Sequence, residues 1–369
     1  MFLSKKEREA RYQSLRQHMT DQGLDALIVR GSSAIRGEGA SFRFLTDFPN
    51  INIPLVLFFF REGAEGPIML VESRFQAKRA KKYSWIDDVR LSFNFLESVL
   101  EILKEKRLGH AAVGTDGLDK LPFLWCQKIE ESFPDLRLTD FGPTLKELRA
   151  YRTPEEIRLV KKSAALVDLA FTEGIKHIKP GKTEWEVIAQ MDFVLKSHGV
   201  EKSFNIISQG PEVDAYPPSG RKIGKKGMVF VELTACYGGY WTQLARALSL
   251  GKPDKTLVKL HQASVQAIRE ALKYLKPGFK VSKPMTVMEE YVRKLGMDYT
   301  PIYGHIVGLD MVEDRPSPKN QTKIAPNMVF IVHPCPALAK SSLLWGETYL
   351  TTERGNLRLN RVGDELIVL

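Results

Sequence analysis

Two stretches of the sequence decide the fold: IKPGKTEWEVIAQMDFVLKSHG at residues 178–199 and LKPGFKVSKPMTVMEEYVRKLG at residues 275–296. Each opens on an aliphatic residue followed by Lys-Pro-Gly, continues as a run that favours a helix, and ends on glycine. The two glycines are 18 positions apart in both stretches, 181 to 199 and 278 to 296. Equal spacing in a shared unit indicates an internal repeat. We therefore expect two related halves, each with a pair of helices, that face each other across one sheet and leave a cleft on its strand side.

A long helix should precede the first stretch. In TPEE, Thr153 suits the N-cap, Pro154 the first helical position and Glu156 the third position after the cap, which together form a capping box. Apolar residues then recur at helical spacing up to Ile175. The pattern predicts a helix that ends near Ile178.

Residues 1–145 indicate a separate α/β unit. A helix at 5–22 should end at Gly23, which suits a C-cap. The elements expected after it are strands at 24–29, 53–60 and 67–73, a helix at 95–106 and a strand at 111–116. A linker-like break follows at 148–153. The sequence therefore predicts two domains, residues 1–148 and residues 149–369.

Composition narrows the class of protein. Of 369 residues, 43% are hydrophobic and 27% charged, which is typical of folded domains and not of disordered chains. The first residues are charged from Lys5 onward, and the longest apolar run, at 53–60, is too short to span a bilayer. We therefore expect a cytoplasmic protein without a membrane partner.

Charge and cysteine content exclude other classes. The net charge is +10, with basic clusters KRAKK at 78–82 and RKIGKK at 221–226. No nucleic-acid-binding motif accompanies these clusters, so we interpret them as solvated surface and expect no nucleic-acid partner. The three cysteines are far apart in sequence, which predicts neither a disulfide framework nor a zinc site.

Seven segments in order along the chain resemble the creatinase, prolidase and aminopeptidase P family. They are RYQSLRQHMTDQGLDALIV (11–29), LRAYRTPEEIRLVKKSA (148–164), IKPGKTEWEV (178–187), GGYWTQLAR (238–246), YGHIVGL (303–309), NMVFIVHP (327–334) and GETYLTTERG (346–355). The resemblance implies an α/β (α+β) chain, in which a creatinase-like N-terminal α/β domain precedes a pita-bread domain with a pseudo-twofold repeat. It also implies a homodimer.

The resemblance also identifies the metal-ligand positions of the family. Its peptidases bind two divalent metals through two Asp, one His and two Glu. The corresponding residues here are, in chain order, Glu232, Gln243, His305, His333 and Gly346, with Glu347 one position beyond. Only one of the four aligned carboxylates remains, so two neighbouring cations would repel each other without compensation. We expect no metal and no cofactor. The alternative is a single metal held by the two histidines with Glu232 or Gln243.

Two other positions of the family differ here. Tyr216 stands where the peptidases, and creatinase, place a histidine, and Glu313 keeps the carboxylate of a His–Glu pair. Imidazole beside carboxylate can transfer protons near neutral pH. We expect catalytic roles for His305, His333, Glu232 and Glu313, and substrate-binding roles for Tyr216, Gln243, Arg246 and Glu347. The alternative is that these groups form a structural hydrogen-bond network. Cys335, directly after His333-Pro334, is interpreted as a buried thiol and not as a nucleophile.

Three functions remain open from the sequence. The first is a metal-independent hydrolase, or related C–N-cleaving enzyme, for a small amide, guanidino or peptide-like substrate. The second is a catalytically inactive pita-bread protein that binds a small molecule, peptide or protein. The third is an Xaa-Pro dipeptidase or aminopeptidase with an atypical metal site. Metal content separates the third from the others, and the convergence of both histidines on a polar pocket favours the first.

Overall fold

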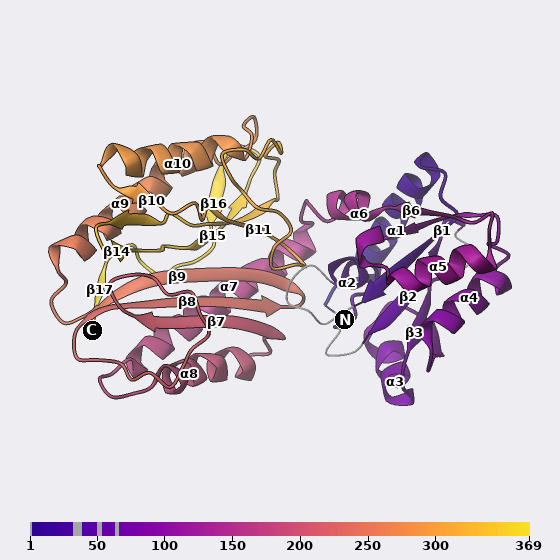
Figure 1. Ribbon diagram of the computed structural model, residues 1–369, viewed down its shortest axis with the longest axis horizontal. Helices are drawn as coiled ribbons and strands as arrows, with labels where there is room; N and C mark the ends of the chain where they lie inside the picture. The colour runs from indigo at the N-terminus through magenta and orange to yellow at the C-terminus, as the bar shows by residue number, and fades with distance from the viewer. Residues whose placement is uncertain (1, 32–38, 50–53, 63–65) are drawn as a thin grey trace. The chain divides into compact units, whose positions relative to one another are not determined.

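A computed structural model describes residues 2–31, 39–49, 54–62 and 66–369. The chain divides into two compact units, Met1–Ala150 and Tyr151–Leu369, where the sequence predicted a division between residues 148 and 149. Figure 1 shows an α/β unit and a larger unit of long strands and helix pairs. Ile53, with which one predicted strand begins, lies outside the described residues.

The N-terminal unit is built on a six-stranded sheet of order β4-β3-β2-β1-β5-β6. Only β2 runs antiparallel to its neighbours, since β1–β5, β3–β4 and β5–β6 are parallel pairs. The strands are β1 (Ala26–Gly31), β2 (Leu55–Phe60), β3 (Ile68–Val71), β4 (Asp88–Leu91), β5 (Ala112–Thr115) and β6 (Arg137–Asp140). The helices are α1 (Lys5–Asp21), α2 (Ala40–Thr46), α3 (Arg74–Tyr83), α4 (Phe95–Glu105), η1 (Leu118–Lys120), α5 (Phe123–Ser132) and α6 (Gly142–Leu148).

Local sequence explains these elements well. Ser4 caps α1 by accepting a hydrogen bond from the Glu7 amide, and the helix ends before Gly23, whose φ of 64° suits glycine. Every residue of β2 is buried, as its unbroken apolar run predicts for a central strand. The opening helix, these strands and the helix predicted at 95–106 are confirmed.

The C-terminal unit holds two helix pairs and three small sheets. Its helices are α7 (Pro154–Gly174), η2 (Ile175–His177), α8 (Glu184–Ser197), α9 (Lys255–Leu272) and α10 (Ser282–Lys294). Its strands are β7 (Lys202–Gln209), β8 (Gly227–Tyr237), β9 (Tyr240–Leu250), β10 (Asp298–Tyr299), β11 (Gly304–Val307), β12 (Val329–Val332), β13 (Pro336–Leu338), β14 (Ser341–Ser342), β15 (Glu347–Thr351), β16 (Asn356–Arg358) and β17 (Ile367–Val368). Within the described ranges, no helix combines the length and the apolar character that crossing a bilayer requires.

The internal repeat is visible in the backbone. Gly181 and Gly278 have φ of 88° and 93°, and Gly199 and Gly296 have φ of 83° and 70°, so the equivalent glycines adopt the same left-handed conformation. A side chain at these positions would be strained, which explains why both copies carry glycine there. The capping box predicted at the start of α7 is also present.

The prediction of one sheet shared by both helix pairs is wrong in detail. The strands form sheets of order β17-β9-β8-β7, β11-β12-β15-β16 and β10-β13-β14. Helices α7 and α8 bury their apolar faces on β8 and β9, whereas α9 and α10 pack around Phe330 and Tyr349. In Figure 1, α8 and α10 accordingly lie at opposite sides of this unit. A single antiparallel bridge, Ala245 to Gly346, joins β9 to the segment that leads into β15.

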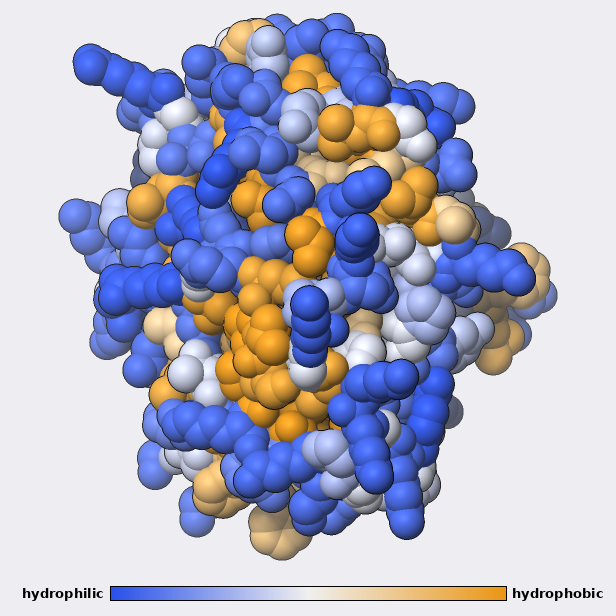
Figure 2. All heavy atoms as spheres, turned by 90° about the vertical axis from the view of Figure 1, so that its left-hand side faces the viewer, coloured by the Kyte–Doolittle hydropathy of each residue, from blue (hydrophilic) through white to orange (hydrophobic). Residues whose placement is uncertain are grey.

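One face of the C-terminal unit has an apolar centre. Figure 2 shows apolar side chains gathered in the middle of this face and hydrophilic side chains around them. A pocket of about 360 Å³ lies where β7 ends and α9 begins, with Pro211, Met228, Leu257 and Leu260 among its lining residues. None of the residues predicted to form the functional site lines this pocket.

Candidate functional site

Four strands bring the predicted ligand positions together. Glu232 lies on β8 and Gln243 on β9, His305 lies on β11, and His333 directly follows β12. The register pairs Gly304 with Val332 and Val332 with Glu347, while Ala245 pairs with Gly346. Segments that are far apart in sequence therefore meet at one place inside the unit.

Glycine is required immediately before His305. Gly304 has φ of 108°, and a Cβ there would lie 1.9 Å from the Ile331 carbonyl oxygen. No side chain fits such a close approach of two backbones. The glycine therefore allows β11 to pair tightly with β12, which places His305 beside His333.

Glu232, Gln243 and His333 form a chain of hydrogen bonds. The Gln243 Nε2 group donates to Glu232 Oε1 at 2.8 Å and to Thr234 Oγ1 at 2.7 Å. Its Oε1 atom lies 2.5 Å from His333 Nε2. Because the Glu232 carboxylate accepts only, it orients the amide of Gln243, and the amide oxygen then requires a proton on His333 Nε2. The neutral His333 ring consequently carries its lone pair on Nδ1, for which the described residues offer no hydrogen-bond partner.

His333 and Gly346 depend on each other. A Cβ at Gly346 would lie 2.8 Å from both Cδ2 and Nε2 of His333 and 2.9 Å from the Ala245 Cβ. The imidazole thus occupies the space that a side chain at position 346 would need.

Burial sets the charge of His333. The residue is only 2% exposed. Burial is the main cause that lowers the pKa of His333 well below its ordinary value, and the nearby His305 is the second cause. The centroids of the two imidazole rings are 5.5 Å apart, and His305 is partly exposed. A buried imidazolium beside a second imidazole is unfavourable, so His333 is neutral at physiological pH.

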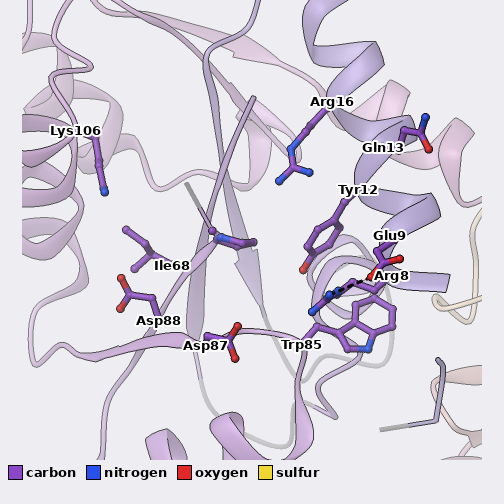
Figure 3. Close-up of a pocket in the computed structure, with 12 residues that line it drawn as sticks. Arg8, Glu9, Tyr12, Gln13, Arg16, Ile68, Trp85, Asp87, Asp88 and Lys106 are labelled. Carbon is purple, nitrogen blue, oxygen red and sulfur yellow. Dashed lines mark ion pairs between the residues drawn. The ribbon is translucent and has the colours of Figure 1, made fainter. Parts of the chain in front are cut away.

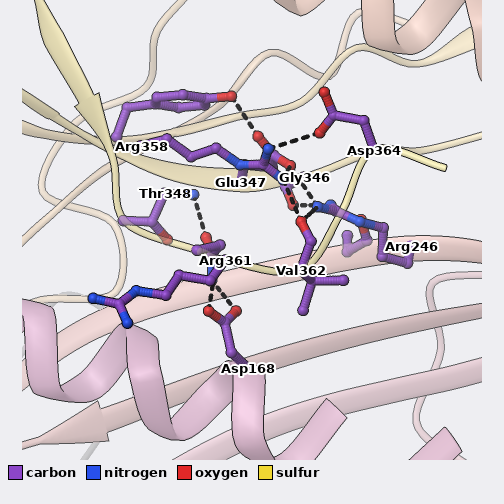
Figure 4. Close-up of polar contacts among 12 residues, drawn as sticks. Asp168, Arg246, Gly346, Glu347, Thr348, Arg358, Arg361, Val362 and Asp364 are labelled. Carbon is purple, nitrogen blue, oxygen red and sulfur yellow. Dashed lines mark hydrogen bonds and ion pairs between the residues drawn. The ribbon is translucent and has the colours of Figure 1, made fainter. Parts of the chain in front are cut away.

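Glu347 lies in a buried ion-pair cluster (Figure 4). Its Oε1 atom accepts from Arg246 and, at 2.5 Å, from Arg358, and its Oε2 atom accepts from the Tyr349 hydroxyl. The Arg246 guanidinium also donates to the Gly346 carbonyl at 3.0 Å and stacks 3.8 Å from the Trp345 ring centroid. Burial lowers the pKa of Arg246 and raises that of Tyr349. Both carboxylate oxygens of Glu347 are therefore engaged in holding the start of β15.

The remaining predicted residues lie in loops. Tyr216 is 74% exposed, so its ring is at the surface. Glu313 accepts a hydrogen bond from the Asp310 amide at 3.1 Å within the turn that follows β11. Cys335 is buried, which raises its thiol pKa to about 11 and keeps the sulfur protonated. The interpretation of Cys335 as a buried thiol is confirmed.

Three residues of this region were missed by the sequence analysis. Thr234 accepts from Gln243, whereas Tyr349 and Arg358 donate to Glu347. Thr234 and Tyr349 each lie two residues after a predicted site residue on the same strand, so the alternation of side chains would have placed them on the same face. Arg358 has no such signal, because it reaches Glu347 from β16.

The donor set does not suit a pair of divalent cations. Mn²⁺ and Co²⁺ pairs need several anionic oxygens, but here the Gln243 amide and the imidazoles of His305 and His333 accompany the Glu232 carboxylate. The Gln243 and Glu232 side chains already bind each other, and the Glu347 carboxylate is neutralised by two arginines. Among the residues that the structure describes, no three His, Cys, Asp or Glu side chains are grouped so that they could hold a metal ion.

Two known families match the chain. Residues 11–151 match the creatinase/prolidase N-terminal domain, and residues 158–360 match metallopeptidase family M24. The chain is 26% identical over 314 residues to the Xaa-Pro dipeptidase of Pyrococcus furiosus, covering 83% of this chain and 87% of that protein. It is 27% identical over 272 residues to the Xaa-Pro dipeptidase of Lactobacillus helveticus, covering 70% of this chain and 73% of the relative.

Solved structures agree on the fold. The X-Pro aminopeptidase of Thermotoga maritima MSB8 is similar with a TM-score of 0.87 at 21% identity, covering 97% of this chain and 99% of that one. The prolidase of Pyrococcus horikoshii OT3 gives a TM-score of 0.82 at 21% identity over 97% of this chain and 100% of that one. These matches confirm a creatinase-like N-terminal domain followed by a pita-bread domain, and the chain belongs to metallopeptidase family M24.

Proposed function

We propose that this protein is a metal-independent hydrolase of family M24 that cleaves a C–N bond in a small amide, guanidino or peptide-like substrate. The observation that supports it is the hydrogen-bond chain from Glu232 through Gln243 to His333. The polar groups of these three side chains are therefore engaged with one another. The site therefore keeps groups that can transfer protons and lacks the negative charge that two metals require.

His305 is the proposed acid–base residue. It is partly exposed and lies beside the neutral His333 ring, so it is the imidazole that a ligand can reach. As the oxygen of a water molecule bonds to the substrate carbon, His305 takes the proton from that water. The same proton then passes to the leaving nitrogen as the C–N bond breaks, which returns the ring to its neutral state.

His333 is a positioning residue in this proposal. Gln243 holds its Nε2–H group, and Glu232 in turn orients Gln243, so the ring has one tautomer and one orientation. Because His333 stays neutral, its ring adds no positive charge beside His305. Removal of Glu232 would leave Thr234 as the partner of the Gln243 amide, and because a hydroxyl can donate as well as accept, the orientation of the amide would no longer be fixed.

A homodimer is part of the same proposal. The family resemblance supports it, and the partner expected at the site is a small-molecule or peptide-like ligand. Light scattering after size-exclusion chromatography should give twice the chain mass of 41.8 kDa. A mass equal to that of one chain at micromolar concentration would contradict the dimer without affecting the proposed chemistry.

The proposed reaction is tested by following the loss of candidate substrates in the presence of a chelator. Small amides, guanidino compounds and dipeptides are incubated with the purified protein and EDTA, and products are identified by mass spectrometry. We expect turnover of one substrate class, at a rate that EDTA leaves unchanged. His305→Ala should abolish this turnover. His177→Ala, a control at an exposed position, should leave it unchanged.

Two results would overturn the proposal in different ways. Hydrolysis of Xaa-Pro dipeptides that requires added Mn²⁺, with two metals per chain, would support the peptidase with an atypical metal site. Saturable binding without turnover of any compound would support a catalytically inactive binding protein. Melting curves of both histidine variants show whether a lost activity reflects a lost fold.

A further inference from the structure

The basic cluster at residues 78–82 lies on α3 of the N-terminal unit, and the proposed chemistry does not use it. Figure 1 shows α3 at the lower edge of this unit. The helix has the sequence RFQAKRAKKY, with five cationic side chains and no acidic one. All five are exposed, and none has an ion-pair or hydrogen-bond partner among the described residues. They form the basic face of α3: Arg74, Lys78, Arg79, Lys81 and Lys82.

The helical period directs this face away from the body of the unit. Gln76 and Ala80, four residues apart, are the buried residues of α3. Phe75, Lys78 and Lys82 recur at i, i+3 and i+7, so they share one side of the helix, away from the two buried residues. The helix is therefore anchored by one side and presents a row of cations, with a phenylalanine at its start, on the other.

The positive charge of α3 is not balanced by its surroundings in the sequence. On α1, by contrast, Arg8 pairs with Glu9 at 3.5 Å, beside the pocket of about 590 Å³ that Figure 3 shows. The stretch at residues 73–86, which contains α3, has no acidic residue. An anionic surface would therefore be attracted to the basic face of α3 without competition from carboxylates of the same stretch.

Two phenylalanines protrude at one edge of the same region. Phe75 is 89% exposed in the first turn of α3, and Phe93 is 92% exposed just before α4. Strands β3 and β4 are parallel neighbours, with Val71 paired to Leu91, so the segments that carry both rings leave the sheet at the same edge. Leu91 is itself 41% exposed. Apolar side chains gathered on a protein surface mark a place of contact with a partner.

A lipid surface suits this combination of charge and apolar rings better than other anionic or apolar partners. Contact between the α3 helices of two copies would place five cations against another five, which is repulsive. A base of single-stranded nucleic acid stacks on a ring face and would leave the rest of a protruding ring in water. The interfacial region of a bilayer surrounds such a ring, and anionic headgroups lie beside it.

We propose that α3 and the two phenylalanines bind the protein peripherally to a bilayer that contains anionic lipids. The basic face of α3 lies against the headgroups, and the rings of Phe75 and Phe93 insert between them. The expectation of no membrane partner was based on the lack of a spanning segment, but a peripheral protein binds without one. This binding does not depend on the proposed hydrolase chemistry.

Co-sedimentation of the full chain with vesicles tests the proposal. Vesicles of phosphatidylcholine alone are compared with vesicles that also contain phosphatidylserine, at increasing concentrations of NaCl. We expect binding to the anionic vesicles to be at least about tenfold tighter and to weaken with salt, because salt screens the headgroup charge. Equal binding to both kinds of vesicle, or binding to neither, overturns the proposal.

Charge variants assign the lipid contact to α3. Lys78→Gln combined with Lys82→Gln should weaken binding about 25-fold, at about fivefold for each cation removed. Lys104→Gln combined with Lys128→Gln makes the same change in net charge at exposed positions on α4 and α5, and should alter binding by less than about twofold. If both double variants bind alike, the overall charge and not α3 attracts the lipid, and the proposal is wrong.

Ring variants test insertion. Phe75→Ser and Phe93→Ser should each weaken vesicle binding at least about fivefold, whereas Phe123→Ser, at an 82% exposed position on α5, should not. Melting curves should stay unchanged, because all three side chains are exposed. Two outcomes overturn the membrane proposal by assigning the surface to another partner. One is tighter binding of oligouridylate than of vesicles, and the other is a lower oligomeric mass of the Phe75 and Phe93 variants.

Discussion

Gly346→Ala tests the mutual dependence of Gly346 and His333. The new methyl carbon would lie 2.8 Å from two ring atoms of His333 and 2.9 Å from the Ala245 Cβ, well inside the ~3.5–4.0 Å of favourable carbon contacts. Gly346 is not among the glycines with positive φ, so the substitution adds contact strain without backbone strain. The buried ring is held by Gln243 and cannot move without losing that hydrogen bond.

The expected loss of unfolding free energy is about 1–3 kcal/mol, the usual cost of overpacking a core. In a unit of this size the melting temperature should fall by about 2–4 °C for each kcal/mol. Scanning calorimetry measures the effect in the purified full chain. Gly355→Ala is the matched control, because a Cβ at Gly355 meets no atom within 4 Å, and it should change stability by less than about 0.5 kcal/mol.

A double-mutant cycle assigns the loss to His333. The His333→Ala background removes the two atoms that lie nearest to the methyl group at position 346, so the cost of that methyl group should fall by about 1 kcal/mol or more. If Gly346→Ala costs the same in both backgrounds, or no more than Gly355→Ala, then the His333 ring does not occupy the space beside Gly346, and the reasoning is wrong.

Three further predictions concern metal, pH and thiol chemistry. Elemental analysis of the purified protein should find no stoichiometric Mn²⁺, Co²⁺ or Zn²⁺. A variant that combines four changes should bind Mn²⁺ detectably by calorimetry: Glu232→Asp, Gln243→Asp, His333→Glu and Gly346→Glu. Two metals per unchanged chain would contradict the prediction. Because burial lowers the pKa of His333 in the folded state, the unfolded state binds the proton first, so stability should be full above pH ~6.5 and fall below it by up to about 1.4 kcal/mol per pH unit. Urea unfolding should show a shallower fall in His333→Gln, and identical slopes would contradict the assignment. Cys335, with its thiol pKa raised to about 11 by burial, should react with iodoacetamide at pH 7.5 far more slowly than the partly exposed Cys126, which peptide mapping of the alkylated sites checks; comparable labelling of both would contradict its burial.

Much of the fold was predictable because its signals are local. Some of these signals act within a few residues of the chain, and each was found where expected. They are the capping box at Thr153, Gly23 after the end of α1, and the repeated glycines. Strand limits were less accurate: the strand predicted at 24–29 is β1, Ala26–Gly31. Leu24 is buried and Asp25 pairs with Arg61, but both residues lie before the paired stretch, which depends on β2 and β5.

The assignment of residues to the family's ligand positions rests on the resemblance of ordered motifs and remains a prediction. The contacts of these residues could not be predicted from the sequence. Gln243 and His333 are 90 residues apart, and Arg246 and Glu347 are 101 apart, so the sequence could not reveal that the first pair shares a hydrogen bond or that the second forms a buried ion pair. The assignment of Gln243, Arg246 and Glu347 to substrate binding therefore remains a prediction, while the structure places each of them in contact with other side chains.

The sequence by itself determined the order of helices and the internal repeat, since propensity and capping are properties of short segments. The tertiary structure alone decided that the helix pairs cover separate sheets and that the His333 ring lies against Gly346. Packing between distant segments sets these features. Burial and side-chain hydrogen bonds form only where segments that are remote in sequence come within a few ångströms of each other.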